Sequence, residues 1–211
     1  NKKFSESLSN YAPIRNFMIK EQPSIKEQRE MLDTLLGYNL IIVSIHKSND
    51  NPWKDHNIER KTDLFLQTLA LQSKIILNIF ANPYVINDFL FTNNFDGVIM
   101  AYQNSEVAQH LVAQSIFGGV SIRGRLPVST LHYKINTGQS TNSFRIKYTI
   151  PKELGVNESI LYKIDSIAEH AIRERATPGC QILIAKEGKV FFQKSYGYHT
   201  YSKSKKVDNS D

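Results

Sequence analysis

The chain has 211 residues, of which 41% are hydrophobic and 22% are charged, a balance that is ordinary for a globular protein. The net charge of +6 is spread along the chain, with one local cluster at Lys203, Lys205 and Lys206. A nucleic-acid-binding protein usually gathers its positive charge on one face, so this distribution argues against nucleic acid as a partner. A membrane-spanning helix needs ~20 consecutive apolar residues, and the sequence contains no such stretch.

Cys180 is the only cysteine, so the chain cannot form an internal disulfide. It lies in the apolar run GCQILIA, which favours a buried small side chain over a reactive thiol. The chain begins at Asn1, and no signal peptide opens it. We expect it to be a piece of a longer protein, in which an export signal could precede this segment.

Hydrophobic periodicity predicts an alternation of helices and strands through residues 1–131. Helices are expected at residues 4–11, 24–36, 60–72, 84–89 and 105–117, and strands at residues 14–19, 39–45, 74–80 and 95–101. Ser24 and Glu27 have the spacing of a capping box at the start of the second helix. Strands that alternate with helices in this way require right-handed parallel crossovers. We therefore predict an α/β fold class, with a doubly wound, mostly parallel sheet and helices on both of its faces.

Helical periodicity is lost over residues 132–155, which we interpret as an extended connector along the surface of the first domain. It returns in residues 156–211, which read as a short α+β segment of one helix and a β-hairpin. The expected elements are a helix that begins after Asn157 and ends before Pro178, and strands at residues 180–185 and 189–194. Beyond Tyr201 the chain is polar and charged, and we expect it to fray.

The polar loop of residues 46–57, HKSNDNPWKDHN, is the candidate for contact with a ligand. It follows the predicted strand at residues 39–45, and open α/β sheets bind ligands at the carboxyl ends of their parallel strands. Its chemistry-bearing side chains are His46, Trp53 and His56, and Trp53 is the only tryptophan of the chain.

Three motifs carry a resemblance in the first half: NPY at residues 82–84, FDGVIMAYQNSEVAQHLVAQSIFG at residues 95–118, and GRLPVS at residues 124–129. In this order and spacing they resemble the C-terminal α/β sandwich domain of glycoside hydrolase family 3. In the second half, PGCQILIAKEGKVFFQKSYGYHTY at residues 178–201 looks like the start of a serine β-lactamase-like or penicillin-binding hydrolase domain. Together the halves are similar to bacterial fusions of a family 3 β-N-acetylhexosaminidase with a β-lactamase-like hydrolase.

The resemblance implies that the catalytic residues lie outside this chain. In family 3 enzymes the nucleophile, and in this branch the His/Asp acid-base pair, belong to an N-terminal (β/α) barrel, the expected partner of residues 1–131. The serine hydrolases take their nucleophile from an SxxK helix, which is expected after Asp211. The SxxK strings at residues 44–47 and 202–205 have the wrong context, one at the end of a strand and the other in a polar tail. No catalytic residue, cofactor or metal is therefore assigned here.

The expected parent cleaves β-linked N-acetylglucosaminyl residues, with peptidoglycan fragments as a candidate substrate, and its serine-hydrolase half cuts an amide or ester. Such a parent would work in the bacterial periplasm or outside the cell. A carbohydrate-binding or domain-docking module is the alternative from a different class. A free-standing α/β hydrolase is the third hypothesis, and the lack of a GxSxG motif argues against it.

Two interpretations of the candidate loop stay open. In one, the loop reaches over the barrel's active site, Trp53 stacks on a sugar ring, and His46 and His56 donate hydrogen bonds. In the other, which we favour, it is an ordinary surface loop whose tryptophan covers apolar surface. The segment of residues 156–211 lacks most of the sheet that it would join in the parent, so we also expect self-association through it.

Overall fold

Three nearly continuous apolar stretches form a parallel sheet in the first half of the computed structural model, which describes residues 2–20, 23–47, 57–209 and 211. The strands are β1 (Ile41–His46), β2 (Ile75–Phe80) and β3 (Gly97–Met100), in the order β1-β2-β3. Both pairs are parallel, with Val43 opposite Leu77 and Leu77 opposite Val98. A central strand that is covered on both faces should be apolar throughout, and most of β2 is fully buried. The predicted α/β class with a parallel sheet is thus confirmed.

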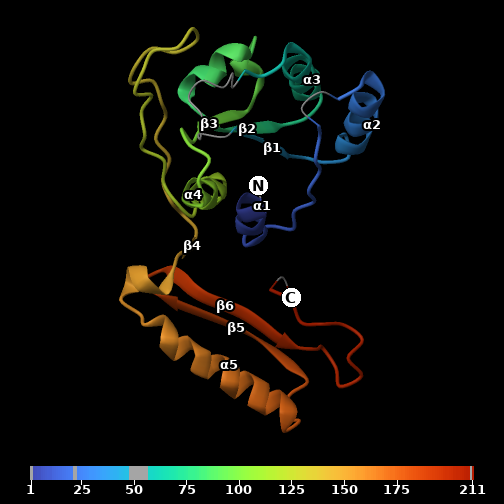
Figure 1. The fold of residues 1–211 in the computed structure, drawn as a ribbon, viewed down its shortest axis with the longest axis vertical. Helices are drawn as coiled ribbons and strands as arrows, with labels where there is room; N and C mark the ends of the chain where they lie inside the picture. Colours follow the sequence, from blue (N-terminus) through green and yellow to red (C-terminus); the bar gives the residue numbers. More distant parts are fainter. Residues whose placement is uncertain (1, 21–22, 48–56, 210) are drawn as a thin grey trace.

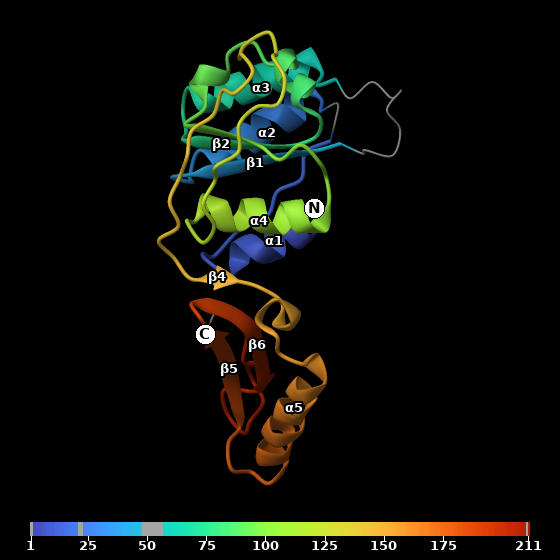
Figure 2. The ribbon, with the colours of Figure 1, turned by 90° about the vertical axis from the view of Figure 1, so that its left-hand side faces the viewer.

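Helices pack against both faces of this sheet (Figures 1 and 2). They are α1 (Lys2–Ser9), α2 (Ile25–Leu35), α3 (Arg60–Ala70) and α4 (Glu106–Ile116). Side chains alternate between the faces of a strand, so Leu77 and Ile79 of β2 join a core with α2 and α3. Phe80 points the other way and packs with Phe4 of α1 and Val112 of α4.

The helix starts follow the capping signals of the sequence. Ser24 and Glu27 form the predicted capping box at the start of α2, with the Ser24 side chain accepting from the Glu27 N–H. Ser105 caps α4 in the same way, through the N–H of Ala108. Each cap satisfies a backbone donor that the first helical turn would otherwise leave unpaired.

One local prediction in the first half was wrong. Residues 14–19 were expected to form a strand, but they form an extended segment with no strand partner in the described structure. Met18 there is 89% exposed, because the short apolar run has no second layer to cover it. The short helix expected at residues 84–89 is present as a 3₁₀ helix, η1 (Pro83–Asp88), and a second one, η2 (Thr92–Asn94), follows it.

A glycine at the end of α4 anchors the connector of residues 132–155. The carbonyl of Gly118 accepts hydrogen bonds from the N–H groups of Phe144 and Arg145. Gly118 has φ +78, and a Cβ at this position would lie 2.3 Å from the Phe144 ring, so only glycine fits. The connector runs along the first lobe (Figure 1), as expected, but it also holds a two-residue strand, β4 (Lys147–Tyr148), and a 3₁₀ helix, η3 (Pro151–Leu154), which the sequence did not predict.

The second lobe is a hairpin backed by one long helix (Figure 2). The elements are α5 (Glu158–Arg173), β5 (Gly179–Lys186) and β6 (Lys189–Gly197), with the sheet order β4-β6-β5. Asn157 caps α5 as predicted, and Glu187 and Gly188 make the hairpin turn with positive φ values of 53 and 72. Asp165 of α5 accepts hydrogen bonds from Lys194 and Tyr196 of β6, which fixes the helix on the sheet.

The expectation that the chain frays after Tyr201 was wrong for the residues that the structure describes. Lys206 pairs with Tyr198 in an antiparallel bridge. The carbonyl of Asn209 accepts hydrogen bonds from the side chains of Gln181 and Gln193 on the hairpin. Polar side chains on the open face of the sheet therefore hold this segment, which composition alone does not reveal.

Candidate functional site

His46 is the last residue of β1 and lies at the carboxyl edge of the parallel sheet. It stands opposite Phe80, the last residue of β2, because parallel strands end at the same edge. The His46 and Phe80 rings are stacked, with centroids 4.5 Å apart and an interplanar angle of 5°. Phe4 of α1 meets the imidazole edge-on at 6.1 Å. The imidazole is therefore packed into the first lobe.

Two amide side chains hold the His46 ring in one orientation. The backbone N–H of Phe4 donates to Gln109 Oε1 at 3.3 Å, so the amide nitrogen of Gln109 points the other way, to Asn104 Oδ1 at 2.9 Å. Asn104 Oδ1 is therefore an oxygen in this position, and His46 Nδ1 lies 2.9 Å from it. Only a protonated Nδ1 can donate there, so His46 is the Nδ1–H tautomer with a lone pair on Nε2.

The surroundings favour a neutral His46. Burial is the largest cause of the lowered pKa of His46. The hydrogen bond with Asn104 acts in the opposite direction. His46 Nε2 is buried and has no hydrogen-bond partner among the described residues. The imidazole thus has one free hydrogen-bond acceptor, Nε2, but this atom is buried.

The candidate loop is only partly described. His46 lies in the described part, whereas Trp53 and His56 lie outside the described residues. Sequence reasoning missed Asn104 and Gln109, although both fall in the motif at residues 95–118. The available signal was their position after β3, at the sheet edge where β1 also ends.

The SxxK strings do not form a nucleophile pair in the structure. Ser44 lies inside β1, and Lys47 follows the strand. Ser202 lies in a turn and hydrogen-bonds Thr200, while Lys205 pairs with Asp211 at 2.7 Å. A serine and its lysine need a helix turn to face each other, and neither string is helical.

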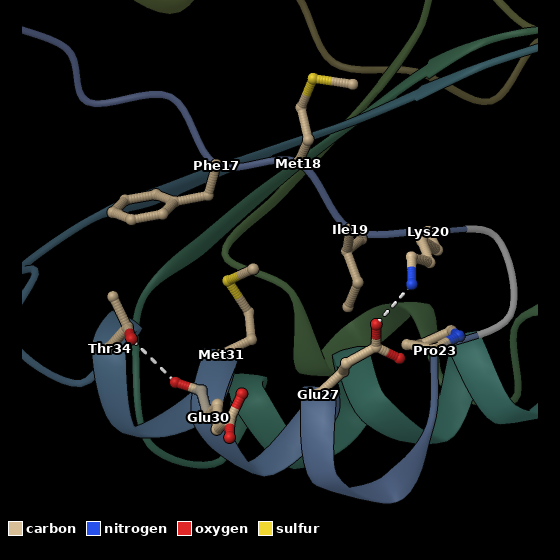
Figure 3. Close-up of a pocket in the computed structure, with 9 residues that line it drawn as sticks. All are labelled: Phe17, Met18, Ile19, Lys20, Pro23, Glu27, Glu30, Met31 and Thr34. Atoms are coloured by element: carbon tan, nitrogen blue, oxygen red, sulfur yellow. Dashed lines mark hydrogen bonds and ion pairs between the residues drawn. The ribbon is translucent and has the colours of Figure 1, made fainter.

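A shallow groove lies between α2 and the extended segment that precedes it (Figure 3). It measures about 290 Å³, and Phe17, Ile19 and Met31 supply apolar side chains to it. An ion pair of 2.7 Å between Lys20 and Glu27 crosses one end. The groove therefore has an apolar lining, but its charged groups are already paired.

Neither a metal centre nor a membrane-spanning helix is found in the part of the chain that the structure describes. No three His, Cys, Asp or Glu side chains gather there as metal ligands would. No helix among the same residues is long and apolar enough to cross a membrane.

The fold and this site define an α/β protein with a three-stranded parallel sheet and a separate α+β lobe. No family model and no solved structure matches the chain. It is similar over 45 residues to Protein flp of Staphylococcus aureus, in strains NCTC 8325 / PS 47 and COL, at 48% identity in each case. Protein flp of strain N315 matches to the same extent. The match covers 21% of this chain and spans only 9% of the length of these relatives.

Proposed function

We propose that this chain is a non-catalytic segment of a bacterial fusion protein that joins a family 3 β-N-acetylglucosaminidase to a β-lactamase-like serine hydrolase. In this proposal residues 1–131 are the C-terminal α/β domain of the glycosidase, with a doubly wound architecture. Residues 132–155 are the connector, and residues 156–211 are the first part of the hydrolase domain. The three family 3 motifs and the parallel sheet of the first lobe support the first assignment. The helix and hairpin of the second lobe support the last.

The state of His46 carries the claim that the segment is non-catalytic. Its Nδ1 is engaged by Asn104, and its Nε2 is covered. A general acid or base must lie within hydrogen-bond distance, about 2.6–3.2 Å, of the substrate atom with which it exchanges a proton. An imidazole fixed in this way supports the sheet edge from which the loop leaves, whereas retaining chemistry needs an accessible nucleophile and acid/base positioned across one sugar.

The buried carboxylate of the first lobe also has a structural task. Asp63 is fully buried and accepts hydrogen bonds from the N–H of Leu90 and the side chain of Gln67. Arg60 Nη1 lies 3.6 Å from Oδ2, the oxygen that also accepts from Leu90. With all of these partners in place, Asp63 ties α3 to the segment before β3 and has no free oxygen for a substrate.

The proposed parent removes N-acetylglucosaminyl residues from peptidoglycan fragments with its barrel, and its serine-hydrolase half cuts an amide or ester in the same material. The partner of the first lobe is then the N-terminal barrel, and the carbohydrate is a substrate of the parent. The compartment is the periplasm or the outside of the cell. Sequential removal of sugar and peptide gives the fusion a chemical reason.

An activity assay on the purified chain tests the non-catalytic assignment. We expect no turnover of an aryl β-N-acetylglucosaminide above the rate of the buffer, with an intact β-N-acetylglucosaminidase as the positive control. Turnover that His46→Ala or Asp63→Asn abolishes in a folded variant would overturn the proposal. The same assay on an aryl ester tests the serine-hydrolase half.

The carbohydrate-binding module is the second candidate, and the position of the candidate loop at the carboxyl edge of the sheet favours it. Trp53 is the only tryptophan, so its fluorescence reports on this loop alone. Titration with N-acetylglucosamine oligomers should change the emission if a sugar stacks on the indole. Unchanged emission at millimolar sugar would remove this candidate.

A further inference from the structure

One side chain of α4 occupies the free edge of β4. The backbone N–H of Tyr148 donates to Gln114 Oε1 at 2.8 Å, and Gln114 Nε2 donates to the carbonyl of Tyr148 at 3.0 Å. The neighbours of Tyr148 point the other way: the N–H groups of Lys147 and Thr149 donate to Gly188 and Val190 of the hairpin region. The Gln114 amide therefore pairs with β4 as an additional strand would, and β4 lies between the two lobes.

His110, one turn before Gln114 on α4, completes this pairing. Because the N–H of Tyr148 fixes the oxygen of the Gln114 amide, the nitrogen faces both the Tyr148 carbonyl and His110 Nε2, which lies 2.8 Å away. His110 Nε2 must then accept, so the ring proton sits on Nδ1. His110 Nδ1 lies 2.9 Å from the hydroxyl of Ser7, a residue of α1 that is 2% exposed. The chain of bonds thus runs from α1 through α4 to β4.

A proton on His110 Nε2 conflicts with this arrangement. It would face the amide nitrogen of Gln114, and two donors cannot hydrogen-bond each other. The other acceptor within reach is the carbonyl of Tyr148 at 3.3 Å, which Gln114 already uses. A charged imidazole would therefore share this carbonyl with the Gln114 amide and would face the amide nitrogen as a second donor at 2.8 Å, which weakens the hold of Gln114 on β4.

The charged groups around His110 add to the conflict. The positive charges of Lys3 in α1 and Lys147 in β4 both disfavour protonation of His110. Burial is the largest cause of the lowered pKa of His110; the Tyr148 carbonyl acts in the opposite direction, because it would accept from the protonated ring, and the two lysines lower the pKa further. Tyr11 and Tyr148 face the same cluster and are neutral, since burial raises the pKa of both phenols. Glu106, one turn before His110, is exposed to solvent.

We propose that Ser7, His110 and Gln114 form a pH-sensitive latch that holds β4, and with it the second lobe, on the first lobe. Neutral His110 keeps the Gln114 amide on Tyr148, and protonation of His110 releases it. The ordinary pKa of histidine is near 6.5, and the closed latch lowers it. The latch is therefore closed at neutral pH and opens as the pH falls below about 6.5, where His110 begins to bind a proton. The latch does not depend on the proposed function.

Amide exchange of the ¹⁵N-labelled full chain tests the latch, with Tyr148 as the reporter. Between pH 7.5 and pH 5 we expect the protection factor of the Tyr148 amide to fall about tenfold, the effect of losing one hydrogen bond. The fall should share its midpoint with the His110 ring signals. The amide of Leu77 in β2 should keep its protection, and the rotational correlation times of the two lobes should diverge. A parallel loss at Leu77 would mean global unfolding and would overturn the proposal.

Two matched variants isolate His110. His110→Gln cannot be protonated, so the Tyr148 protection factor should become independent of pH. His132→Gln removes an exposed histidine of the connector and should leave the wild-type pH dependence intact. An unchanged pH dependence in His110→Gln would sink the latch. If that variant does not fold, the wild-type chain still tests the proposal. Different pH midpoints for the His110 ring signals and for the protection of the Tyr148 amide would also refute the latch.

Discussion

His46 and His110 are each held in one tautomer by amide side chains on or just before α4. Gln109, with Asn104, orients His46 at the sheet edge, and Gln114 orients His110 at the junction of the lobes. In both cases a backbone N–H fixes the amide first, and the amide then fixes the ring. Two glutamines of α4 therefore set the tautomers of two imidazoles, Gln109 through Asn104 and Gln114 directly.

The stability of the chain should fall as the pH is lowered from 6.5 to 5. Burial lowers the pKa of both His46 and His110, so the unfolded chain binds more protons than the folded chain in this range. Glu27 and Glu153, whose pKa values are lowered to about 2 by hydrogen bonds with lysine, serine or threonine partners, lose their contribution only at lower pH. Urea unfolding at closely spaced pH values measures the effect. The double variant His46→Gln/His110→Gln should show a flatter profile, and an unchanged slope would contradict this account.

Asp63→Ala should destabilise the chain by about 2–3 kcal/mol, because it removes a charged acceptor and leaves the Leu90 N–H without its partner. Asp33→Ala is the matched control, since Asp33 is exposed on α2 and its loss should cost less than about 0.5 kcal/mol. Urea unfolding at pH 7 gives both values. Equal effects of the two substitutions would show that the buried carboxylate does not hold α3 in place.

At the scale of single elements, α3 joins the first lobe through a narrow apolar face. Leu69 is 1% exposed in the core against β2, whereas Leu71, at the end of the same helix, is 79% exposed. Leu69→Ala should cost about 3 kcal/mol through lost burial and the cavity left behind. Leu71→Ala should change the free energy of unfolding by less than about 0.5 kcal/mol. Chemical denaturation measures both values. A larger loss of stability in Leu71→Ala than in Leu69→Ala would contradict the described packing.

The long periodic elements were predictable from the sequence, because their apolar spacing matches the layer that buries them. α2 and α5 begin at their predicted caps, and β2 was predicted as a core strand from its mostly apolar run. The run at residues 14–19 has the same composition on a smaller scale, but no neighbouring strand pairs with it in the described structure. Local pattern does not specify a pairing partner, and this explains the error.

The candidate site was predictable only in position. The end of β1 was the correct place to expect His46, since strand ends follow from the apolar pattern. Its partners Asn104 and Gln109 are polar residues at a helix start, and sequence gives no reason to prefer them over Gln103 or Glu106. β4 and the role of Gln114 were also missed, because two residues show no periodicity and a buried glutamine on α4 contradicts the usual pattern.

At the scale of the whole molecule, the second lobe exposes apolar side chains that a small α+β unit would normally cover. Ile160 and Ile167 of α5 are 55% and 69% exposed, and Leu183 of β5 is 50% exposed. Ile160 and Ile167 are two helical turns apart and lie on one face of the helix. Self-association through residues 156–211 remains a prediction, and this exposed face of α5 is the surface expected to mediate it.

Sedimentation velocity over a range of protein concentrations tests this prediction. The mean sedimentation coefficient of the wild-type chain should rise with concentration, because buried apolar area stabilises the contact between two copies. The double variant Ile160→Lys/Ile167→Lys should remain monomeric, whereas Glu169→Ala, at an exposed position away from this face of the same helix, should behave like the wild type. A wild-type coefficient that does not change with concentration would refute self-association.

Sequencing the reading frame on both sides of the chain tests whether these two lobes belong to the proposed fusion protein. The codons before Asn1 are expected to encode a (β/α) barrel with a His/Asp pair, and the codons after Asp211 a helix that begins with SxxK. An upstream region without barrel periodicity, or a downstream region without an SxxK helix, would contradict this proposal.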